Sequence, residues 1–265
     1  MISVLVQCFL IFSPTIVSVF YPLQEIAYSI ISLLGVDVTR FEEIINNIIE
    51  NDKIASIISG IILSIFIYIW RIKTNKDKLF NIGNNYDEYP IWVYWIASKI
   101  LGYGKVSLVR VPIYLQYKLL MKDVFQEIVV DMDVEEKIQS IVVIEENMEN
   151  ISDELNLILI DTYEITKNQI PSNKTSMPTI FIKSGNETDS NRSLNTKFIK
   201  EIRRITNKYS SVYKQVNVFS TTNTNHNQLI VCKCFKNGRR TGFKHVIVYQ
   251  ASRSSYMFNR GYKVL

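Results

Sequence analysis

The sequence predicts a membrane protein with an α-helical N-terminal region of two transmembrane helices, followed by a cytoplasmic α/β or α+β domain. Two long apolar runs lie in the N-terminal part of the chain, and short strand-like runs alternate with amphipathic helical patterns further on. A third observation bears on function. The stretch from Ile202 to Leu265 contains twelve Lys or Arg and no Asp or Glu.

The first apolar run is Ile2–Phe20, and Glu25 is the single charged residue within the range 1–36. About 20 apolar residues cross the hydrocarbon core of a bilayer, and this run is close to that length. Pro14 should kink the helix, which membrane helices tolerate. A cleaved signal peptide is the alternative, but neither a basic n-region nor a small-residue cleavage site is visible.

The second run, Ile54–Trp70, contains no charged residue, and it is followed closely by Arg71 and three lysines. Because basic loops next to a span stay in the cytoplasm, we expect both termini there, in a bacterial inner membrane. The acidic segment 37–53 would form a short outer hairpin. Small residues recur on one predicted face of this helix and would allow close helix packing, unless their spacing is incidental: Ser56, Ser59, Gly60 and Ser64.

A connector is expected over residues 79–130, between a transmembrane hairpin at 1–78 and a basic sensor domain at 131–265. Its aromatic segment Pro90–Leu101 is either interfacial or an ordinary core helix. A helix is predicted from Pro112 to about Val130. Beyond it, strands are predicted at Ile138–Ile144, Leu155–Asp161, Thr179–Lys183, Gln215–Ser220, Gln228–Phe235 and Lys244–Gln250, with a helix over Leu194–Tyr209.

The charge of the chain is strongly divided. Residues 162–265 carry a net charge of +14, and residues 1–161 carry −9. Such asymmetry indicates contact with nucleic acid, a membrane surface or another polyanion. The alternative is that the acidic stretch from Asp123 to Glu164 packs against the basic end of its own or a neighbouring subunit. Three cysteines are too few for a disulfide framework, which favours a reducing compartment.

The C-terminal segment interleaves aromatic rings with cations, and Lys236–Gly242 reads as a basic turn between two strands. Arginine and lysine neutralise phosphates, while rings stack on bases. The pattern therefore predicts a site for a nucleotide or single-stranded DNA. A strand with rings inside and charges outside would give the same pattern. The candidate ligand-binding residues are Arg203, Arg204, Arg239, Arg240, Lys244, Tyr249, Arg253, Tyr256, Phe258 and Arg260.

No catalytic motif is present, so we expect no enzyme activity, catalytic residue, metal or cofactor. Cys232 and Cys234 with His226 or His245 are too few for a convincing metal site. Asp161, Glu164 and Lys167 could form a metal-dependent nuclease site, although their spacing is unremarkable.

In layout and charge, the chain resembles the two-helix membrane effectors of bacterial antiphage defence, such as those of CBASS, some retrons and the Hailong system. The resemblance rests on spans at about 2–34 and 54–70 and a soluble part at about 79–265. It implies a homo-oligomeric pore in the lipid bilayer, controlled by a nucleotide or, in the Hailong case, by single-stranded DNA. It also implies a nucleotidyltransferase-type signal producer encoded alongside.

Three functions remain open at this point: a nucleotide-controlled pore, a membrane tether for nucleic acid without a pore, and a membrane-anchored nuclease.

Overall fold

A computed structural model describes residues 2–21, 24–33, 37, 39–40, 43, 52–82, 86–130, 139–185, 193–236 and 243–265. Its contacts divide the chain into two compact units. We call Met1–Phe80 with Trp92–Lys105 the helical unit, and Asn81–Ile91 with Val106–Leu265 the sheet unit. This division differs from the expected boundaries at 78 and 130, because the segment 79–130 is shared between the two units.

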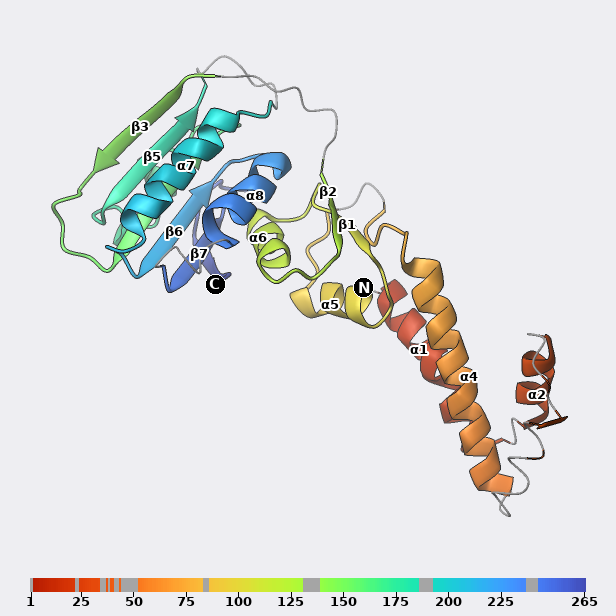
Figure 1. Ribbon diagram of the computed structural model, residues 1–265. Coiled ribbons are helices and arrows are strands. Elements are labelled where there is room, and N and C mark those ends of the chain that lie inside the picture. The colour runs from red at the N-terminus through yellow and green to blue at the C-terminus, as the bar shows by residue number, and fades with distance from the viewer. Residues whose placement is uncertain are drawn as a thin grey trace. The chain divides into compact units, whose positions relative to one another are not determined.

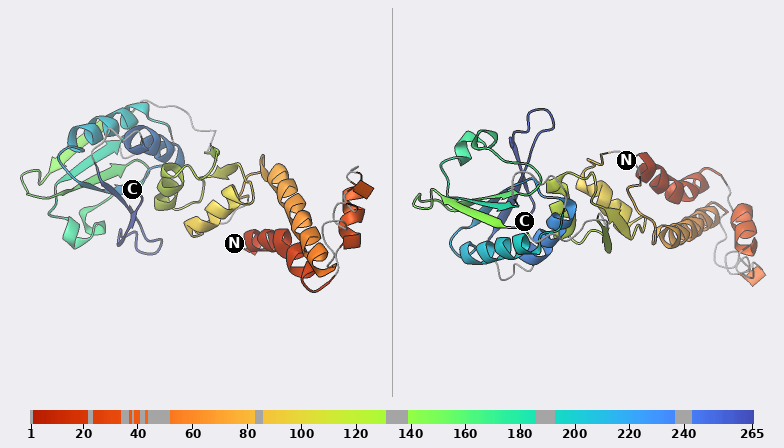
Figure 2. Two further views of the ribbon diagram at one scale, coloured as in Figure 1. Left: turned by 60° about the horizontal axis from the view of Figure 1, so that its bottom comes forward. Right: turned by 90° about the horizontal axis from the view of Figure 1, so that it is seen from above.

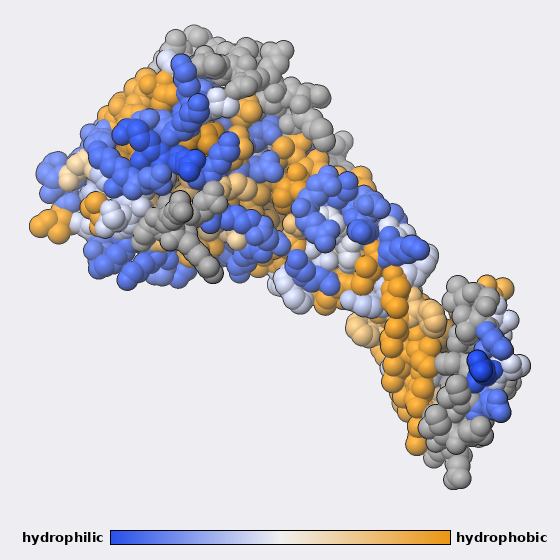
Figure 3. Space-filling view, viewed as in Figure 1, coloured by the Kyte–Doolittle hydropathy of each residue, from blue (hydrophilic) through white to orange (hydrophobic). Residues whose placement is uncertain are grey.

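The helical unit contains α1 (Ile2–Ser18), α2 (Gln24–Leu33), α4 (Asp52–Asn75) and most of α5 (Ile91–Lys99) (Figure 1). Among the described residues, one helical segment, Lys53–Asn75, is long and apolar enough to cross a membrane, and α1 is apolar but shorter. An apolar band covers the visible surface of α4 (Figure 3). The first part of the expected outer hairpin, from residue 37, is only sparsely described, and residues 44–51 lie outside the described residues.

The small residues of α4 form its contact with α1, as their spacing predicts. Ser59 is 0% exposed, and Ser64 Oγ lies 2.8 Å from the hydroxyl of Thr15. Ser56 Oγ donates to the carbonyls of Ser18 and Tyr21 at 3.1 and 2.9 Å. A Cβ at Gly60 would lie 2.8 Å from the Pro14 carbonyl oxygen. The two backbones therefore approach each other where side chains are smallest.

Pro14 lies inside α1, and the helix continues through it to Ser18; a kink at this position stays a prediction. Proline has no N–H and so leaves the Leu10 carbonyl without its usual helical donor. The hydroxyl of Ser13 donates to that carbonyl at 3.0 Å instead.

The connector differs from the sequence prediction. The helix expected over 112–130 ends at Met121 as α6 (Ile113–Met121), because Asp123 adopts a left-handed backbone with φ of 45°. The chain then enters β2 (Glu127–Val129), which pairs with β1 (Lys105–Ser107). In α5, Tyr94 is buried, while Trp92 and Trp95 are 47% and 50% exposed. Contact of α5 with a membrane stays a prediction.

The sheet unit is α/β. Its six strands lie in the order β3-β5-β4-β6-β7-β8, with parallel inner strands and antiparallel strands at both edges. The strands are β3 (Ile141–Glu146), β4 (Glu154–Ile160), β5 (Thr179–Ser184), β6 (Gln215–Ser220), β7 (His245–Gln250) and β8 (Arg260–Lys263). Five of them match predicted strands closely, and β8 lies in the segment for which a strand is the alternative.

Helices cover one face of this sheet, where α7 (Thr196–Tyr209) and α8 (Thr224–Ile230) lie (Figure 1). The connection from β4 to β5 lies on the opposite face and holds two short 3₁₀ helices, η1 (Lys167–Gln169) and η2 (Ser172–Lys174) (Figure 2). The chain thus reverses its winding at β4, so the carboxyl ends of the parallel strands form the edge where α/β sheets bind ligands.

The strand predicted at Gln228–Phe235 is wrong. These residues are helical, in α8 and in the π-helix η3 (Val231–Lys236). A short apolar run cannot be told from a helix by periodicity alone. The run lies in the crossover between the parallel strands β6 and β7, which requires a helix-like connection rather than a hairpin. The turn predicted at Lys236–Gly242 therefore follows the helix η3 rather than a strand, and residues 237–242 lie outside the described part.

A buried polar network joins the amino ends of β4 and β6. Lys174, 8% exposed, donates from Nζ to Glu154 Oε2 at 2.5 Å. Asn217 Nδ2 donates to the same oxygen at 2.8 Å and to Asn156 Oδ1 at 3.2 Å. Burial opposes ionisation of Glu154, but the bonds from Asn217 and Lys174 outweigh it and hold the pKa of Glu154 below its ordinary value.

Replacing Lys174 by methionine is expected to lower the free energy of unfolding by about 2 kcal/mol at pH 7, because it leaves a partly buried carboxylate without its cation. A lowered carboxyl pKa contributes stability above its unfolded value, about 4.3, and loses it as pH falls through the folded value. The difference between wild type and Lys174→Met should therefore shrink at pH 3. Urea unfolding of the full chain in detergent, followed by circular dichroism, measures it.

Lys214→Met is the matched control, because Lys214 pairs with Asp153 at the exposed surface, where ion pairs contribute little. A destabilisation by Lys174→Met that is equal at pH 3 and pH 7 would contradict the assigned role of the Glu154 carboxylate.

Candidate functional site

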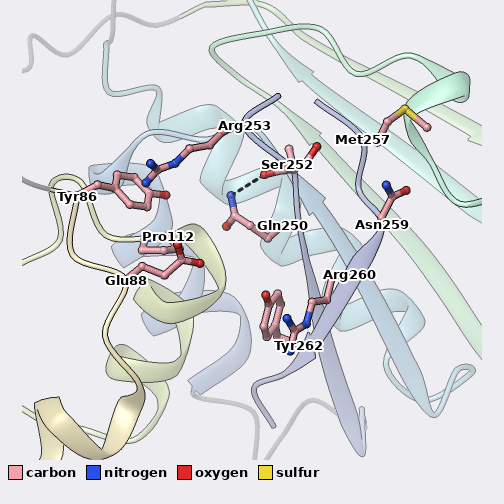
Figure 4. Close-up of a pocket in the computed structure, with 11 residues that line it drawn as sticks. Tyr86, Glu88, Pro112, Gln250, Ser252, Arg253, Met257, Asn259, Arg260 and Tyr262 are labelled. Atoms are coloured by element: carbon pink, nitrogen blue, oxygen red, sulfur yellow. Dashed lines mark hydrogen bonds between the residues drawn. The ribbon is translucent and has the colours of Figure 1, made fainter. Parts of the chain in front are cut away.

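A pocket of about 330 Å³ opens at the carboxyl end of β7, entirely within the sheet unit (Figure 4). The end of β7, the loop 251–259 and β8 form one wall, and the segment 86–88 with Pro112 at the start of α6 forms the other. The lining residues are Tyr86, Glu88, Pro112, Gln250, Ala251, Ser252, Arg253, Met257, Asn259, Arg260 and Tyr262.

The loop 251–259 is held by its own turn and by η1. Ser252 N donates to the Met257 carbonyl at 2.9 Å, and Phe258 N donates to the Gln169 carbonyl at 2.9 Å. The Phe258 ring is 1% exposed and packs edge-on against Phe219 at 5.6 Å between ring centroids. This anchoring fixes the backbone of the loop, from which Arg253 projects, and Arg260 follows at the start of β8.

Both arginines of the pocket lie over tyrosine rings. The guanidinium of Arg253 is 3.7 Å from the ring centroid of Tyr86, and that of Arg260 is 4.9 Å from the ring centroid of Tyr262. Tyr262 in turn stacks on Tyr114, with centroids 3.7 Å apart and planes 10° apart. Stacking of this kind holds a planar guanidinium in one orientation and leaves N–H groups at its edge for a ligand.

Two tyrosines of these stacks, Tyr86 and Tyr114, stay neutral at physiological pH. Burial, reinforced by the nearby Tyr262 hydroxyl, raises the pKa of Tyr114 to about 12. Burial also raises the pKa of Tyr86, against the lowering effect of its hydrogen bond with Arg253. Neutral rings add no negative charge to the pocket, so the arginines keep their full attraction for an anion.

Lysines pair with part of the acidic stretch, and the two pocket arginines do not. Six lysines of the basic end pair with carboxylates of the stretch Asp123–Glu164, in partial agreement with the alternative that the two regions pack together. Neither pocket arginine pairs with a carboxylate in the part of the chain that the structure describes. The pairs are Lys167–Glu146, Lys174–Glu154, Lys183–Glu164, Lys208–Glu145, Lys214–Asp153 and Lys236–Asp123.

Of the predicted binding residues, the pocket brings together Arg253 and Arg260. Arg204 lines a separate groove along α7 and pairs with Glu201, and Arg203 is exposed on the same helix. Lys244 is exposed before β7, and Tyr256 is 67% exposed but does not line the pocket. Arg239 and Arg240 lie outside the described residues.

Two predicted base-stacking rings have a different role. Phe258 is buried, and a base cannot reach it, so we assign it to the core. Tyr249 packs on that same core, stacked on Phe219 with centroids 4.5 Å apart. For these two rings, the alternation of rings and cations agrees with the alternative interpretation, in which rings face the core and cations face outward.

Sequence reasoning missed the other half of the pocket. Tyr86 and Glu88 lie in a polar segment without a motif, and Gln250 and Asn259 carry no pattern of their own. The Gln250 side chain has one observable signal: its Oε1 is buried without a hydrogen-bond partner, while its Nε2 donates to the Ala251 carbonyl at 3.3 Å. A buried acceptor without a donor is rare in folded proteins.

The residues considered for nuclease chemistry do not form one site. Glu164 pairs with Lys183, and Lys167 pairs with Glu146 at 2.7 Å. Asp161 Oδ2 accepts from His226 Nδ1 at 2.7 Å, and His226 Nε2 accepts from the Asn195 backbone N–H at 2.9 Å. Both ring nitrogens of this buried histidine are therefore engaged. Among the described residues, no group of three His, Cys, Asp or Glu could hold a metal ion.

Comparison with known proteins gives one family match and a likeness to solved structures. A family model described as SUa-2TM, the SMODS- and ubiquitin-system-associated 2TM effector domain, matches residues 2–265. No curated protein matches the chain. Among solved structures, it is similar to the Acinetobacter baumannii Cap4 SAVED/CARF-domain-containing receptor, seen with the cyclic trinucleotide 3′3′3′-cAAA and with 2′3′3′-cAAA.

The sequence identities to the two receptor structures are 11% and 10%, and the TM-scores are 0.44 and 0.45. Each likeness covers 64% of this chain and 41% of the receptor. Likenesses this distant carry no functional argument.

Proposed function

Because the chain belongs to the SUa-2TM family of effector domains, we propose that it is a membrane effector of antiphage defence whose sheet unit binds a nucleotide. Binding would control a homo-oligomeric pore formed by two spans, one in α1 with α2 and one in α4. The observation that carries the proposal is the pair of stacked arginines without carboxylate partners in the described residues, at the carboxyl end of a parallel strand.

The size of the pocket favours a nucleotide over a tract of single-stranded DNA. Small-molecule pockets have volumes of about 300–1,000 Å³, and 330 Å³ lies at the lower end of that range. A single-stranded DNA site tracks about 4–16 nucleotides along an open groove with stacking rings. Of the rings predicted to stack, Phe258 is buried in the core and Tyr256 lies outside the pocket.

The connectivity of the chain supports coupling between the pocket and the membrane. Tyr86 and Glu88 lie in the segment Asn81–Ile91, which belongs to the sheet unit. Phe80, just before this segment, and Trp92, just after it, belong to the helical unit. Asn81 Nδ2 donates to the Ser107 carbonyl at 2.8 Å and holds the segment at its start. A ligand in the pocket would thus touch a segment whose two ends continue directly into the helical unit.

Two features support the membrane part. The segment Lys53–Asn75 is long and apolar enough to cross a bilayer. Its small polar face is covered by α1, which leaves apolar side chains outward, as a lipid-facing hairpin requires. A nucleotidyltransferase-type enzyme encoded alongside would supply the ligand.

Binding of the detergent-purified full chain to labelled nucleotides tests the proposal. The panel holds linear and cyclic di- and trinucleotides and a short single-stranded DNA, each measured across a salt series. We expect a nucleotide to bind with an affinity that falls as salt rises, because salt screens the attraction between its phosphates and the pocket arginines. DNA binding that is tighter than every nucleotide would favour the tether, and absence of all binding at low salt would refute a polyanion site.

A further inference from the structure

One carboxylate, Glu88, lines the same pocket as the two arginines that lack a carboxylate partner. Among the described residues, Glu88 forms no ion pair and accepts no hydrogen bond. Figure 4 shows its side chain beside Pro112, on the same wall as Tyr86 and away from Asn259. Glu88 therefore neutralises neither arginine, and its carboxylate is exposed at the pocket.

We propose that Glu88 is a specificity-determining residue, which accepts a hydrogen bond from a donor group of the bound nucleotide. The inference rests on the proposed function of the pocket. The donor would be a ribose 2′-hydroxyl or an exocyclic amino group of the base, because these are the donors that a nucleotide carries away from its phosphates.

The charges of the pocket support a division of roles in which the arginines bind phosphate and Glu88 binds a donor group. A phosphate suits Arg253 and Arg260, whose N–H groups are fixed by stacking, but it is repelled by a nearby carboxylate. An inorganic polyanion therefore gains two attractions and meets one repulsion. A nucleotide avoids the repulsion when its phosphate lies at the arginines and its donor faces Glu88.

Gln250 supports the same conclusion from the opposite wall. Its Oε1 is a second acceptor in the pocket lining that lacks a donor. Leaving this buried oxygen without a hydrogen bond destabilises the fold by about as much as the loss of one hydrogen bond. A rotation of this amide would present Oε1 to the pocket interior. The lining thus holds two arginines without a carboxylate partner and two acceptors without a donor among the described residues, and together these fit a ligand that carries both an anionic group and a hydrogen-bond donor.

Specificity of this kind discriminates against ligands that lack the donor, because the bound ligand would cover the Glu88 carboxylate, which is exposed in the free protein, and leave it without a hydrogen-bond partner. Glu88 would consequently exclude inorganic polyphosphate as well as nucleotides whose donor is missing. It would do so without contributing much to the affinity for phosphate itself.

The test uses four probes on the detergent-purified full chain: adenosine 5′-monophosphate, its 2′-deoxy analogue, purine riboside 5′-monophosphate, which lacks the amino group, and inorganic pyrophosphate. Wild type should bind one of the two analogues roughly 10-fold more weakly than adenosine monophosphate. Which analogue is weaker identifies the donor as hydroxyl or amine.

Glu88→Ala should bind all three nucleotides alike, and Glu88→Gln should bind pyrophosphate more tightly than wild type does. Glu149→Gln, an exposed carboxylate outside the pocket, is the control and should behave as wild type. The inference is overturned if wild type does not distinguish the three nucleotides, or if both Glu88 variants bind the four probes as wild type does.

The failure of the inference and that of the proposed function can be told apart. If nucleotide binding requires Arg253 but is unchanged in the Glu88 variants, the inference is overturned and the proposed function is not. If wild type binds no probe here and no nucleotide in the wider panel, the nucleotide pocket is wrong and the role of Glu88 is wrong with it.

Discussion

Replacing Arg253 and Arg260 together by alanine is expected to abolish nucleotide binding by the full chain. Each guanidinium would make charge-assisted hydrogen bonds to phosphate, which contribute about 1.5–3 kcal/mol, or roughly 10- to 100-fold in affinity. Two such losses place the dissociation constant beyond a practical titration range. The salt dependence of any residual binding should also become shallower, because fewer phosphate charges are neutralised.

Single substitutions separate charge from geometry at this site. Arg253→Lys keeps the charge but loses the planar group that lies 3.7 Å over Tyr86, so we expect an affinity between those of wild type and Arg253→Ala. Arg203→Ala is the matched control, since Arg203 is an exposed arginine on α7 outside the pocket. If the double variant and wild type bound the nucleotide with equal affinity, the pocket would not be the nucleotide site.

Replacing Gly60 by leucine is expected to separate α1 from α4. A Cβ at this position would lie 2.6 Å from Ser18 Cβ and 2.8 Å from the Pro14 carbonyl oxygen, closer than real Cβ contacts allow. The Pro14 oxygen belongs to the backbone, so a side-chain rotation cannot relieve the clash. Overpacking of this kind costs about 1–3 kcal/mol and often more where backbones must move.

Cysteine cross-linking reports this separation directly. The hydroxyls of Thr15 and Ser64 are 2.8 Å apart. In a variant whose three native cysteines are replaced by serine, Thr15→Cys and Ser64→Cys should therefore form a disulfide bond when membranes are oxidised. Gly60→Leu should abolish that bond. Ile61→Leu, at a neighbouring position 42% exposed, should leave it intact. Full cross-linking in Gly60→Leu would show that the helices pack differently.

The elements that can be predicted from the sequence are those with a clear local pattern. The spacing of Ser56, Ser59, Gly60 and Ser64 indicates the face of α4 that packs on α1, because helical period alone places them together. Five strands are visible as short β-branched runs. The run Gln228–Phe235 is misassigned because its apolar residues suit either state, and the parallel pairing of β6 and β7 decides between them.

The candidate site can be predicted only in part. Arg253 and Arg260 stand out by composition, but composition does not show that lysines pair with six carboxylates of the acidic stretch while these arginines lack a carboxylate partner in the described residues. Phe258 is misassigned because alternating rings and cations look the same whether the ring faces a ligand or the core. Tyr86 and Glu88 join the site from a distant part of the sequence, and no local pattern bridges that separation.

The most direct test of the central claim is the ion permeability of proteoliposomes that contain the full chain, measured with and without the nucleotide that binds most tightly in the panel. We predict that the nucleotide changes the ion flux of wild type and leaves the flux of the Arg253→Ala/Arg260→Ala variant unchanged. A wild-type protein that binds the nucleotide, yet shows the same flux with and without it, would contradict a nucleotide-controlled pore.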